Sequence, residues 1–196
     1  MEHYYSEQQK SLLKIKKIKQ RIKNIEFEFY TSSGVFSRER IDKGTLILAE
    51  NMTVEKNSDV LDIGCGIGVI GIAAAKLFNA NVVMSDINQR AVMLVKMNAK
   101  LNNVKVDIYQ GNLYEPIKDP NFDAILSNPP QTAGKEICFK LIAQSKKYLK
   151  NKGSLQLVAR HNKGGKTLSK KMGEIFGNVK VIAKEAGYWV YVSEKK

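Results

Sequence analysis

From residue 58 onward, short apolar segments alternate with longer segments in which apolar residues recur at helical spacing. This pattern predicts strands at Val60–Ile63, Val82–Ser85, Val104–Tyr109, Phe122–Leu126, Ser154–Ala159, Val179–Ala183 and Tyr188–Val192, and helices at Val69–Phe78, Asn88–Leu101, Lys135–Leu149 and Lys166–Phe176. Alternating strands and helices indicate an α/β fold, in which a largely parallel sheet carries helices on both faces. The turn near Glu185-Ala186-Gly187 is too short for a parallel crossover, so one antiparallel strand must enter the sheet at its C-terminal end.

Residues 1–57 have a different pattern, and we expect them to form an extension packed on a main domain of residues 58–196, in one compact unit. In Ser11–Ile25, isoleucines and leucine recur at helical spacing and lysines cover the other faces, which predicts a basic amphipathic helix. Its charged face either contacts phosphates or is simply solvated. Glu26–Tyr30 alternates charged and aromatic residues, as a half-buried strand does, and Thr45–Asn51 is expected to be helical.

The charge balance of the 196-residue chain points to a polyanionic partner. There are 32 Lys and Arg against 19 Asp and Glu, a formal net charge of +13. Such an excess favours nucleic acid, with a lysine-rich solvated surface as the alternative. No apolar run reaches the roughly 20 residues that cross a bilayer, and the polar N-terminus carries no signal peptide. The two cysteines, Cys65 and Cys138, form neither a disulfide framework nor a zinc motif, so we expect a cytoplasmic protein without membrane or metal.

A glycine-rich segment from Asp62 to Gly71 lies between a predicted strand and a predicted helix. Closely spaced glycines let the backbone approach a ligand that a Cβ would block. Gly66-x-Gly68-x-x-Gly71 fits the dinucleotide fingerprint. Asp62-x-Gly64-x-Gly66-x-Gly68 instead resembles the first motif of S-adenosylmethionine-dependent methyltransferases. The two registers imply different cofactors.

Two acidic residues bear on the choice of register. Asp86 ends the next predicted strand, about 20 residues beyond the glycines, where an acid binds ribose hydroxyls in either reading. Its alternative role, a helix N-cap, can be filled by Asn88. Asp62 favours the methyltransferase register, because a carboxylate there would repel a pyrophosphate and suits the cationic amino and sulfonium groups of S-adenosylmethionine.

Ser127-Asn128-Pro129-Pro130 follows the predicted strand Phe122–Leu126. Ligands of open α/β sheets bind beyond the carboxyl ends of the strands. Consecutive prolines fix φ and remove two N–H donors, which leaves the carbonyls of Asn128 and Pro129, with the Asn128 amide oxygen, as acceptors for an –NH2 group. An Asn-Pro turn is the alternative, but the glycines and Asp86 upstream favour the acceptor site.

In this order, Asp62–Gly68, Asp86 and Asn128–Pro130 resemble the motifs of amino-methylating enzymes, most closely the small-subunit ribosomal RNA guanine-N2 methyltransferases. The resemblance covers roughly Phe27–Val192, and the chain is similar to compact archaeal members of that group. It implies a Rossmann-like, seven-stranded, mostly parallel sheet with an antiparallel C-terminal strand, S-adenosylmethionine as cofactor, and RNA, above all ribosomal RNA, as partner.

Two further stretches share the resemblance. Gly34–Ser37 with Asp42–Thr45 is similar to the part that precedes the cofactor fold in that group, and Gly111–Tyr114 is similar to its third cofactor motif. By this resemblance the cofactor-binding residues are Asp62, Gly64, Cys65, Gly66, Gly68, Asp86, Ile87, Asn112, Leu113 and Asn128, and the catalytic ones are Asn128, Pro129 and Pro130.

The expected reaction is methyl transfer to an exocyclic amine of a nucleobase in RNA, first of all guanine N2 of ribosomal RNA. Protein glutamine-N5 methylation, adenine-N6 methylation of RNA or DNA, and a non-catalytic RNA-binding module remain as alternatives. One departure concerns the position after Pro130, which often holds an aromatic residue that stacks on the target base. Here it is Gln131, so stacking would come from Phe36 or Tyr114. The sequence does not indicate the oligomeric state.

Overall fold

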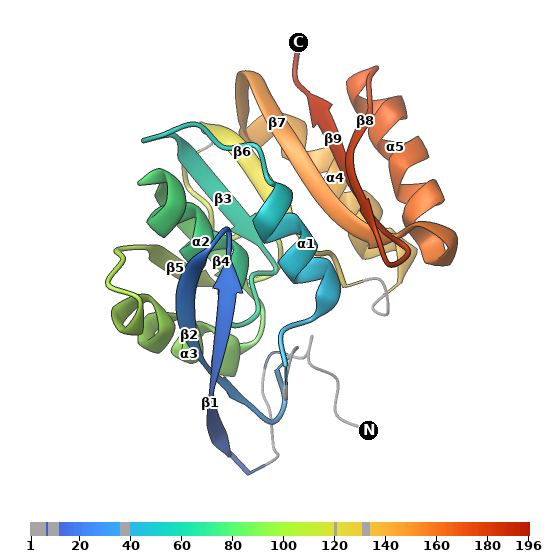
Figure 1. Ribbon diagram of the computed structural model, residues 1–196. Helices are drawn as coiled ribbons and strands as arrows, with labels where there is room; N and C mark the ends of the chain where they lie inside the picture. The colour runs from blue at the N-terminus through green and yellow to red at the C-terminus, as the bar shows by residue number, and fades with distance from the viewer. Residues whose placement is uncertain (1–6, 8–11, 36–39, 120, 131–133) are drawn as a thin grey trace.

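The computed structural model describes residues 7, 12–35, 40–119, 121–130 and 134–196, and its centre is a seven-stranded sheet (Figure 1). The strand order is β5-β4-β3-β6-β7-β9-β8. The strands are β3 (Asp59–Ile63), β4 (Asn81–Asp86), β5 (Asp107–Gln110), β6 (Phe122–Ser127), β7 (Leu149–Arg160), β8 (Lys180–Glu185) and β9 (Tyr188–Glu194). Neighbouring strands pair in parallel, except that β9 is antiparallel to both β7 and β8. The predicted mostly parallel sheet with an antiparallel C-terminal strand is confirmed.

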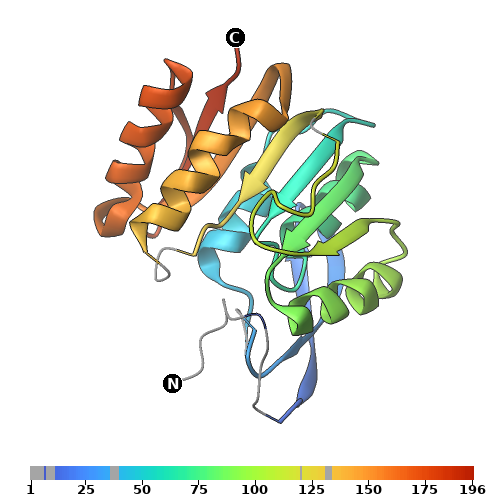
Figure 2. The same ribbon diagram turned by 180° about the vertical axis from the view of Figure 1, so that it is seen from behind.

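Helices cover both faces of this sheet (Figures 1 and 2). One face carries α1 (Lys43–Asn51), α2 (Val69–Phe78) and α3 (Gln89–Leu101), and the other carries α4 (Lys135–Tyr148) and α5 (Lys166–Phe176). Each face of the sheet has its own hydrophobic core, because successive side chains of a strand point to opposite faces. In β3, Val60 packs with α1–α3, while Leu61 and Ile63 pack with α4 and α5. None of the helices described is long and apolar enough to cross a membrane.

The boundary of β7 differs most from the prediction within the main domain. Residues 151–153, between the predicted helix and the strand predicted from Ser154, lie inside β7, which begins at Leu149. Lys152 has a left-handed φ of 66°, and the pairing with β6 shifts register there. A Cβ on Gly153 would lie 2.9 Å from two carbonyl oxygens, so the irregular strand requires glycine at this point.

The predicted basic helix at Ser11–Ile25 is wrong. The described part of this segment forms β1 (Ile15–Ile22), which pairs antiparallel with β2 (Ile25–Ser32). Ile18 and Ile22 fit both a helical and an alternating pattern. The aromatic face of β2 decides between them, because Ile18 and Gln20 lie opposite Phe29 and Phe27. On the other face, Lys17 and Lys19 form ion pairs with the acids of β2, with N–O distances of 2.8 Å and 3.0 Å for the two closest. Part of the expected cationic surface is therefore neutralised within the hairpin.

Two asparagines, Asn98 in α3 and Asn102 at its C-cap, hold the hairpin on the main domain. Asn102 accepts a hydrogen bond from the Glu28 N–H at 3.2 Å and donates one to its carbonyl at 2.7 Å. Asn98 does the same for Tyr30, at 2.6 Å and 3.0 Å, and also donates to the carbonyl of Ile67. Asn98 and Asn102 are one helical turn apart, which matches the distance between Glu28 and Tyr30 along the strand. Their side-chain amides therefore make the hydrogen bonds to the edge of β2 that a neighbouring strand would make.

Replacing Asn98 with alanine should loosen this docking. The Tyr30 N–H and the Ile67 carbonyl would lose their partner, at a cost of about 1–3 kcal/mol in the free energy of unfolding. Urea unfolding and amide hydrogen exchange of β2 measure the effect. Lys96→Ala, an exposed position on the same helix, is the matched control and should stay within about 0.5 kcal/mol of the parent. Unchanged protection of the β2 amides in Asn98→Ala would contradict this account.

Candidate active site

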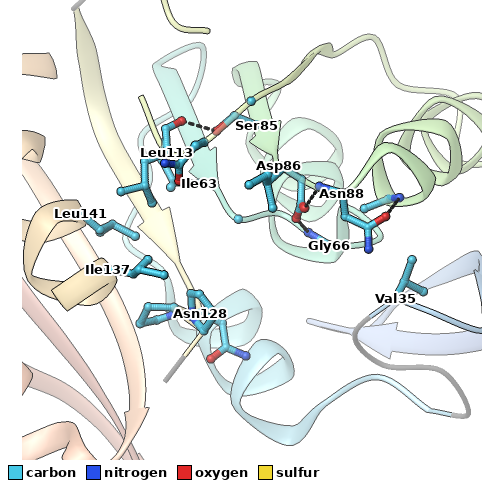
Figure 3. A pocket seen from close by; sticks show the side chains of 17 residues that line it. Val35, Ile63, Gly66, Ser85, Asp86, Asn88, Leu113, Asn128, Ile137 and Leu141 are labelled. Atoms are coloured by element: carbon cyan, nitrogen blue, oxygen red, sulfur yellow. Dashed lines mark hydrogen bonds between the residues drawn. The ribbon is translucent and has the colours of Figure 1, made fainter. Parts of the chain in front are cut away.

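A pocket opens at the carboxyl ends of β3, β4 and β6 (Figure 3). Nine of the residues predicted for the site line it: Gly64, Gly66, Asp86, Ile87, Asn112, Leu113, Asn128, Pro129 and Pro130. Residues from four separate stretches thus meet where parallel strands end, as expected for an open α/β sheet. Three predicted residues, Asp62, Cys65 and Gly68, lie in or behind the glycine loop without lining the pocket.

The glycine loop is held in a conformation that other residues rarely adopt. Gly64, Gly66 and Gly68 have φ of 68°, 55° and 85°. No atom of the described residues lies within 4 Å of where a Cβ on Gly64 or Gly66 would be, so these two glycines border open space. Gly68 caps α2 and packs against Val95. The N–H groups of Gly64 and Cys65 both donate to the carbonyl of Ser85, which ties the loop to β4.

Gly71 serves packing rather than ligand binding. A Cβ there would clash with the end of the Met84 side chain and crowd Val82. Gly71 is therefore a close-packing residue of α2, and contact between this helix and the sheet accounts for the glycine that completed the dinucleotide pattern.

Asp86 joins the glycine loop to the start of α3. One carboxylate oxygen accepts from the Gly66 N–H at 2.8 Å and the other from the Asn88 N–H at 2.9 Å. Asn88 is the N-cap of α3, accepting from the N–H groups of Arg90 and Ala91, so capping does not need Asp86. The enclosed position of Asp86 raises its pKa, against the lowering effect of the two N–H donors. The carboxylate faces the pocket beside open glycine backbone (Figure 3).

Asp62 is fully buried behind the same loop. One carboxylate oxygen accepts from the Gly71 N–H at 2.9 Å, and the other has no hydrogen-bond partner among the described residues. Burial, with a smaller contribution from the charge of Asp86, raises the pKa of Asp62 to about 7. A buried carboxylate without full satisfaction favours a cationic neighbour. Together with the open glycines, the Asp62 oxygen fits the amino end of a methionine-like cofactor.

The far wall of the pocket includes a strained backbone position. Leu113 has a left-handed φ of 51°, which is costly for a residue with a branched side chain. The Ser85 hydroxyl donates to the Leu113 carbonyl at 3.0 Å and holds the turn (Figure 3). Apolar side chains of Ile63, Ile137 and Leu141 complete this side, giving a flat ring an apolar surface to contact.

Asn128 has both amide hydrogens engaged on the side of α1. Its Nδ2 donates to Asp42 Oδ2 at 3.0 Å and to Thr45 Oγ1 at 2.9 Å. A carboxylate only accepts, so the –NH2 group must face Asp42 and the amide oxygen must face the other way. Asn128 also lines the pocket with Pro129 and Pro130, so these hydrogen-bond acceptors share the pocket with Asp86 and Leu113.

Tyr114 is unsuited to the stacking role considered for it. Its ring is 2% exposed, stacks on Tyr148 with centroids 4.5 Å apart, and its hydroxyl donates to the Leu141 carbonyl. That part of the prediction is wrong, because the ring belongs to the core under α4. Gln131 and Phe36 lie outside the described residues.

The sequence between residues 26 and 192 matches the family model for the methyltransferase small domain. The chain belongs to this family. It is therefore an S-adenosylmethionine-dependent methyltransferase with a Rossmann-like fold.

Relatives of this methyltransferase differ in substrate and in length. An uncharacterized Bacillus subtilis protein, YbxB, is 36% identical over 99% of this chain and 98% of its own length. A candidate protein N5-glutamine methyltransferase of Methanocaldococcus jannaschii is 34% identical, over 71% of this chain and 81% of its own. Ribosomal RNA small subunit methyltransferase C of Psychromonas ingrahamii is 34% identical over 70% of this chain, and only 41% of that longer protein is covered.

A solved structure has the same fold over nearly the whole of this methyltransferase. A Thermus thermophilus 16S rRNA N2 methyltransferase, in complex with AdoMet and guanosine, superposes with a TM-score of 0.82. The match covers 95% of this chain and 51% of the other, at 24% sequence identity. At this identity the likeness establishes the fold.

Asp42 and Thr45 are the site residues that sequence reasoning missed. The stretch Asp42–Thr45 carries part of the family resemblance, but no role was predicted for its residues. A signal was present, because Asp three residues before Thr at the start of a helix is an N-cap pattern, and Asp42 does cap α1. Nothing local to that pattern could reveal the contact with Asn128, which lies more than 80 positions away.

Replacing Asp62 with asparagine should change how stability depends on pH. The pKa of Asp62 is about 7 in the folded chain and 3.8 as a free side chain, so the unfolded chain releases this proton first as pH rises. The parent therefore loses stability relative to Asp62→Asn between about pH 4 and pH 7, by up to roughly 4 kcal/mol at 1.36 kcal/mol per pKa unit, and the difference is constant above that window. Urea unfolding across this range measures it. Parallel stability curves for the two proteins would show that Asp62 is not held at a raised pKa.

Proposed function

We propose that this methyltransferase modifies an exocyclic amine of a nucleobase in RNA, with guanine N2 of ribosomal RNA as the expected target. The observation that carries the proposal is that Asn128, Pro129 and Pro130 line the same pocket as Asp86 and Leu113. Acceptors for an –NH2 group thus share a cavity with the residues expected to hold the cofactor.

An aryl amine needs this kind of site because its lone pair is delocalised into the ring. The Asn128 amide oxygen and the carbonyls of Asn128 and Pro129 would accept both amine hydrogens and favour a pyramidal nitrogen. Fixed acceptors also stabilise the positive charge that develops on that nitrogen. Positioning supplies most of the rate, so no strong base is needed before transfer.

The cofactor-binding roles follow from the same arrangement. S-adenosylmethionine, when bound, supplies an electrophilic methyl group. Asp62 and the backbone at Gly64 and Gly66 would hold its methionine end, and Asp86 would accept from the ribose hydroxyls. Asn112 and Leu113 would contact the adenine.

RNA is supported as the acceptor by charge and by relatives. The net charge of +13 attracts a polyanion. A relative at 34% identity is named for ribosomal RNA. A paired target base would have to be flipped out, or be unpaired already.

Protein glutamine is the second candidate. A side-chain amide also presents an –NH2 group to the Asn128 acceptors. The M. jannaschii relative, of which the match covers 81%, is named for that activity. The strong positive charge favours RNA over this candidate. Adenine N6 would satisfy the same acceptors and differs in the base alone.

Asn128→Ala should abolish methyl transfer and leave the Kd for S-adenosylmethionine within about tenfold of the parent, because the side chain orients the acceptor. Single-turnover transfer and calorimetry measure the two quantities. Asn121→Ala, an exposed asparagine at the opposite end of β6, is the control and should keep full activity. Undiminished turnover in Asn128→Ala would rule out the mechanism.

Incubation with labelled S-adenosylmethionine and separate ribosomal RNA, tRNA and protein fractions identifies the substrate. Nucleoside analysis of the labelled fraction should give N2-methylguanine from ribosomal RNA. Label in protein glutamine would transfer the assignment to the second candidate, and label in N6-methyladenine would change the base. No labelled product from any of these fractions would contradict both the RNA and the protein candidate.

Asp86→Ala should weaken binding of S-adenosylmethionine by about 10–100-fold, the range expected when a charge-assisted hydrogen bond worth roughly 1.5–3 kcal/mol is lost. Calorimetry measures the Kd directly. Asp107→Ala, an exposed acid on the neighbouring strand, is the matched control. An unchanged Kd in Asp86→Ala would exclude the ribose role.

A further inference from the structure

We propose that Asp42 and Thr45 are positioning residues that set the orientation of the Asn128 amide, and so determine the turnover rate without contacting the substrate. The inference rests on the proposed function, because it explains how the acceptor at Asn128 is held in place. It assigns a role to the Asp-Lys-Gly-Thr stretch at the start of α1.

The hydrogen-bond pattern allows a single orientation of the Asn128 amide. Nδ2 has two hydrogens, and Asp42 Oδ2 and Thr45 Oγ1 take both, at 3.0 Å and 2.9 Å. Turning the amide over would place its oxygen against the Asp42 carboxylate, where neither atom can donate. The amide oxygen is thereby directed away from α1 and left available to another donor.

Asp42 and Thr45 are themselves rigidly placed. Asp42 caps α1 by accepting from the Thr45 N–H at 3.2 Å, so the two residues are already tied to each other. The Tyr188 hydroxyl donates to the other oxygen of Asp42 at 3.4 Å. Gly44 lies directly against the Tyr188 ring, where a Cβ would come within 2.7 Å of a ring carbon. The helix start is thus fixed between β9 and the loop after β6.

These contacts act through Asn128. Thr45 is 8% exposed, and the pocket lining includes Asn128 but neither Asp42 nor Thr45. A hydrogen bond from the amide to a carboxylate is charge-assisted and polarises the amide, which strengthens its oxygen as an acceptor. An amide free to rotate would lose both this polarisation and the alignment on which positional catalysis depends.

Paired substitutions at each residue separate positioning from folding. Thr45→Val removes the hydroxyl in nearly the same volume, and Thr45→Ser restores it. Asp42→Ser keeps an N-cap for α1 but is too short to reach Asn128, whereas Asp42→Asn keeps both the cap and an acceptor. We expect kcat to fall about tenfold or more in Thr45→Val and Asp42→Ser and to stay within about threefold in Thr45→Ser. Asp42→Asn keeps the acceptor but loses the charge, so its kcat should lie between these two limits. The KM and Kd for S-adenosylmethionine should be unchanged in all four.

The side-chain amide resonance of Asn128 gives a readout that needs no substrate. It is assigned by its disappearance in Asn128→Ala. Its two protons should exchange slowly with solvent in the parent, Thr45→Ser and Asp42→Asn, and faster in Thr45→Val and Asp42→Ser. Unchanged exchange in the last two variants would overturn the inference.

The two measurements distinguish the failure of this inference from that of the proposed function. If the parent methylates an amine but Thr45→Val and Asp42→Ser have its kcat, the positioning role is wrong and the proposed function stands. If the parent methylates no RNA or protein fraction, the proposed function fails, and the Asn128 resonance alone decides whether the amide is held. A fall in kcat that the conservative variants do not reverse would also contradict a positioning role.

Discussion

The parallel pairing of β3 with its two neighbours is the constraint on which the rest of the site depends. Asp62 lies opposite Met84 on one side and Leu126 on the other, so the three strands reach the same edge of the sheet within a few residues. Loops that follow such strands must meet. The glycine loop, the carboxylate at the end of β4 and the acceptors after β6 become neighbours through backbone pairing alone, although they are spread over about a third of the chain. A shift of one residue in this register would turn Asp62 to the opposite face of the sheet.

Burial of acids at this edge has an energetic cost that a cationic ligand would offset. One oxygen of Asp62 has no hydrogen-bond partner in the part of the chain that the structure describes, and burial raises the pKa values of both Asp62 and Asp86. In a core built for stability alone, such groups would be replaced by apolar ones. Such carboxylates lower the stability of the folded protein when the site is empty, and a positively charged group bound beside them would offset that cost. Functional sites commonly depart from optimal packing in this way.

The sequence predicted the sheet and the pocket because their signals are local. Each strand of the main domain is a short apolar run, and the residues at its end follow directly in the chain, so Asp86 and Asn128 could be placed without tertiary information. Residues 12–32 show the opposite case. Ile18 and Ile22 satisfy helical and extended spacing alike, and what selects the strand is pairing with Phe27 and Phe29 and docking on Asn98 and Asn102, which no local window contains. The stacking role predicted for Tyr114 was wrong for a related reason. Its position at the end of the stretch that resembles the third cofactor motif does not reveal that its ring packs in the core.

The chain before β3 contributes to the site as well as to the fold. Val35 lines the pocket, and the segment leading to it is fixed by bonds from Asn88 to the Gly34 carbonyl and from Arg90 to the Ser33 carbonyl. Asn88 and Arg90 lie at the start of α3, directly after β4, the strand that ends at Asp86. Asn88 thus joins the N-terminal segment to Asp86 through hydrogen bonds, and Asp42 at the start of α1 joins the same part of the chain to Asn128. The boundary proposed at residue 57 therefore marks a change in sequence pattern only. The pocket is lined by residues from both sides of it, since Val35 precedes the boundary and the other lining residues follow it.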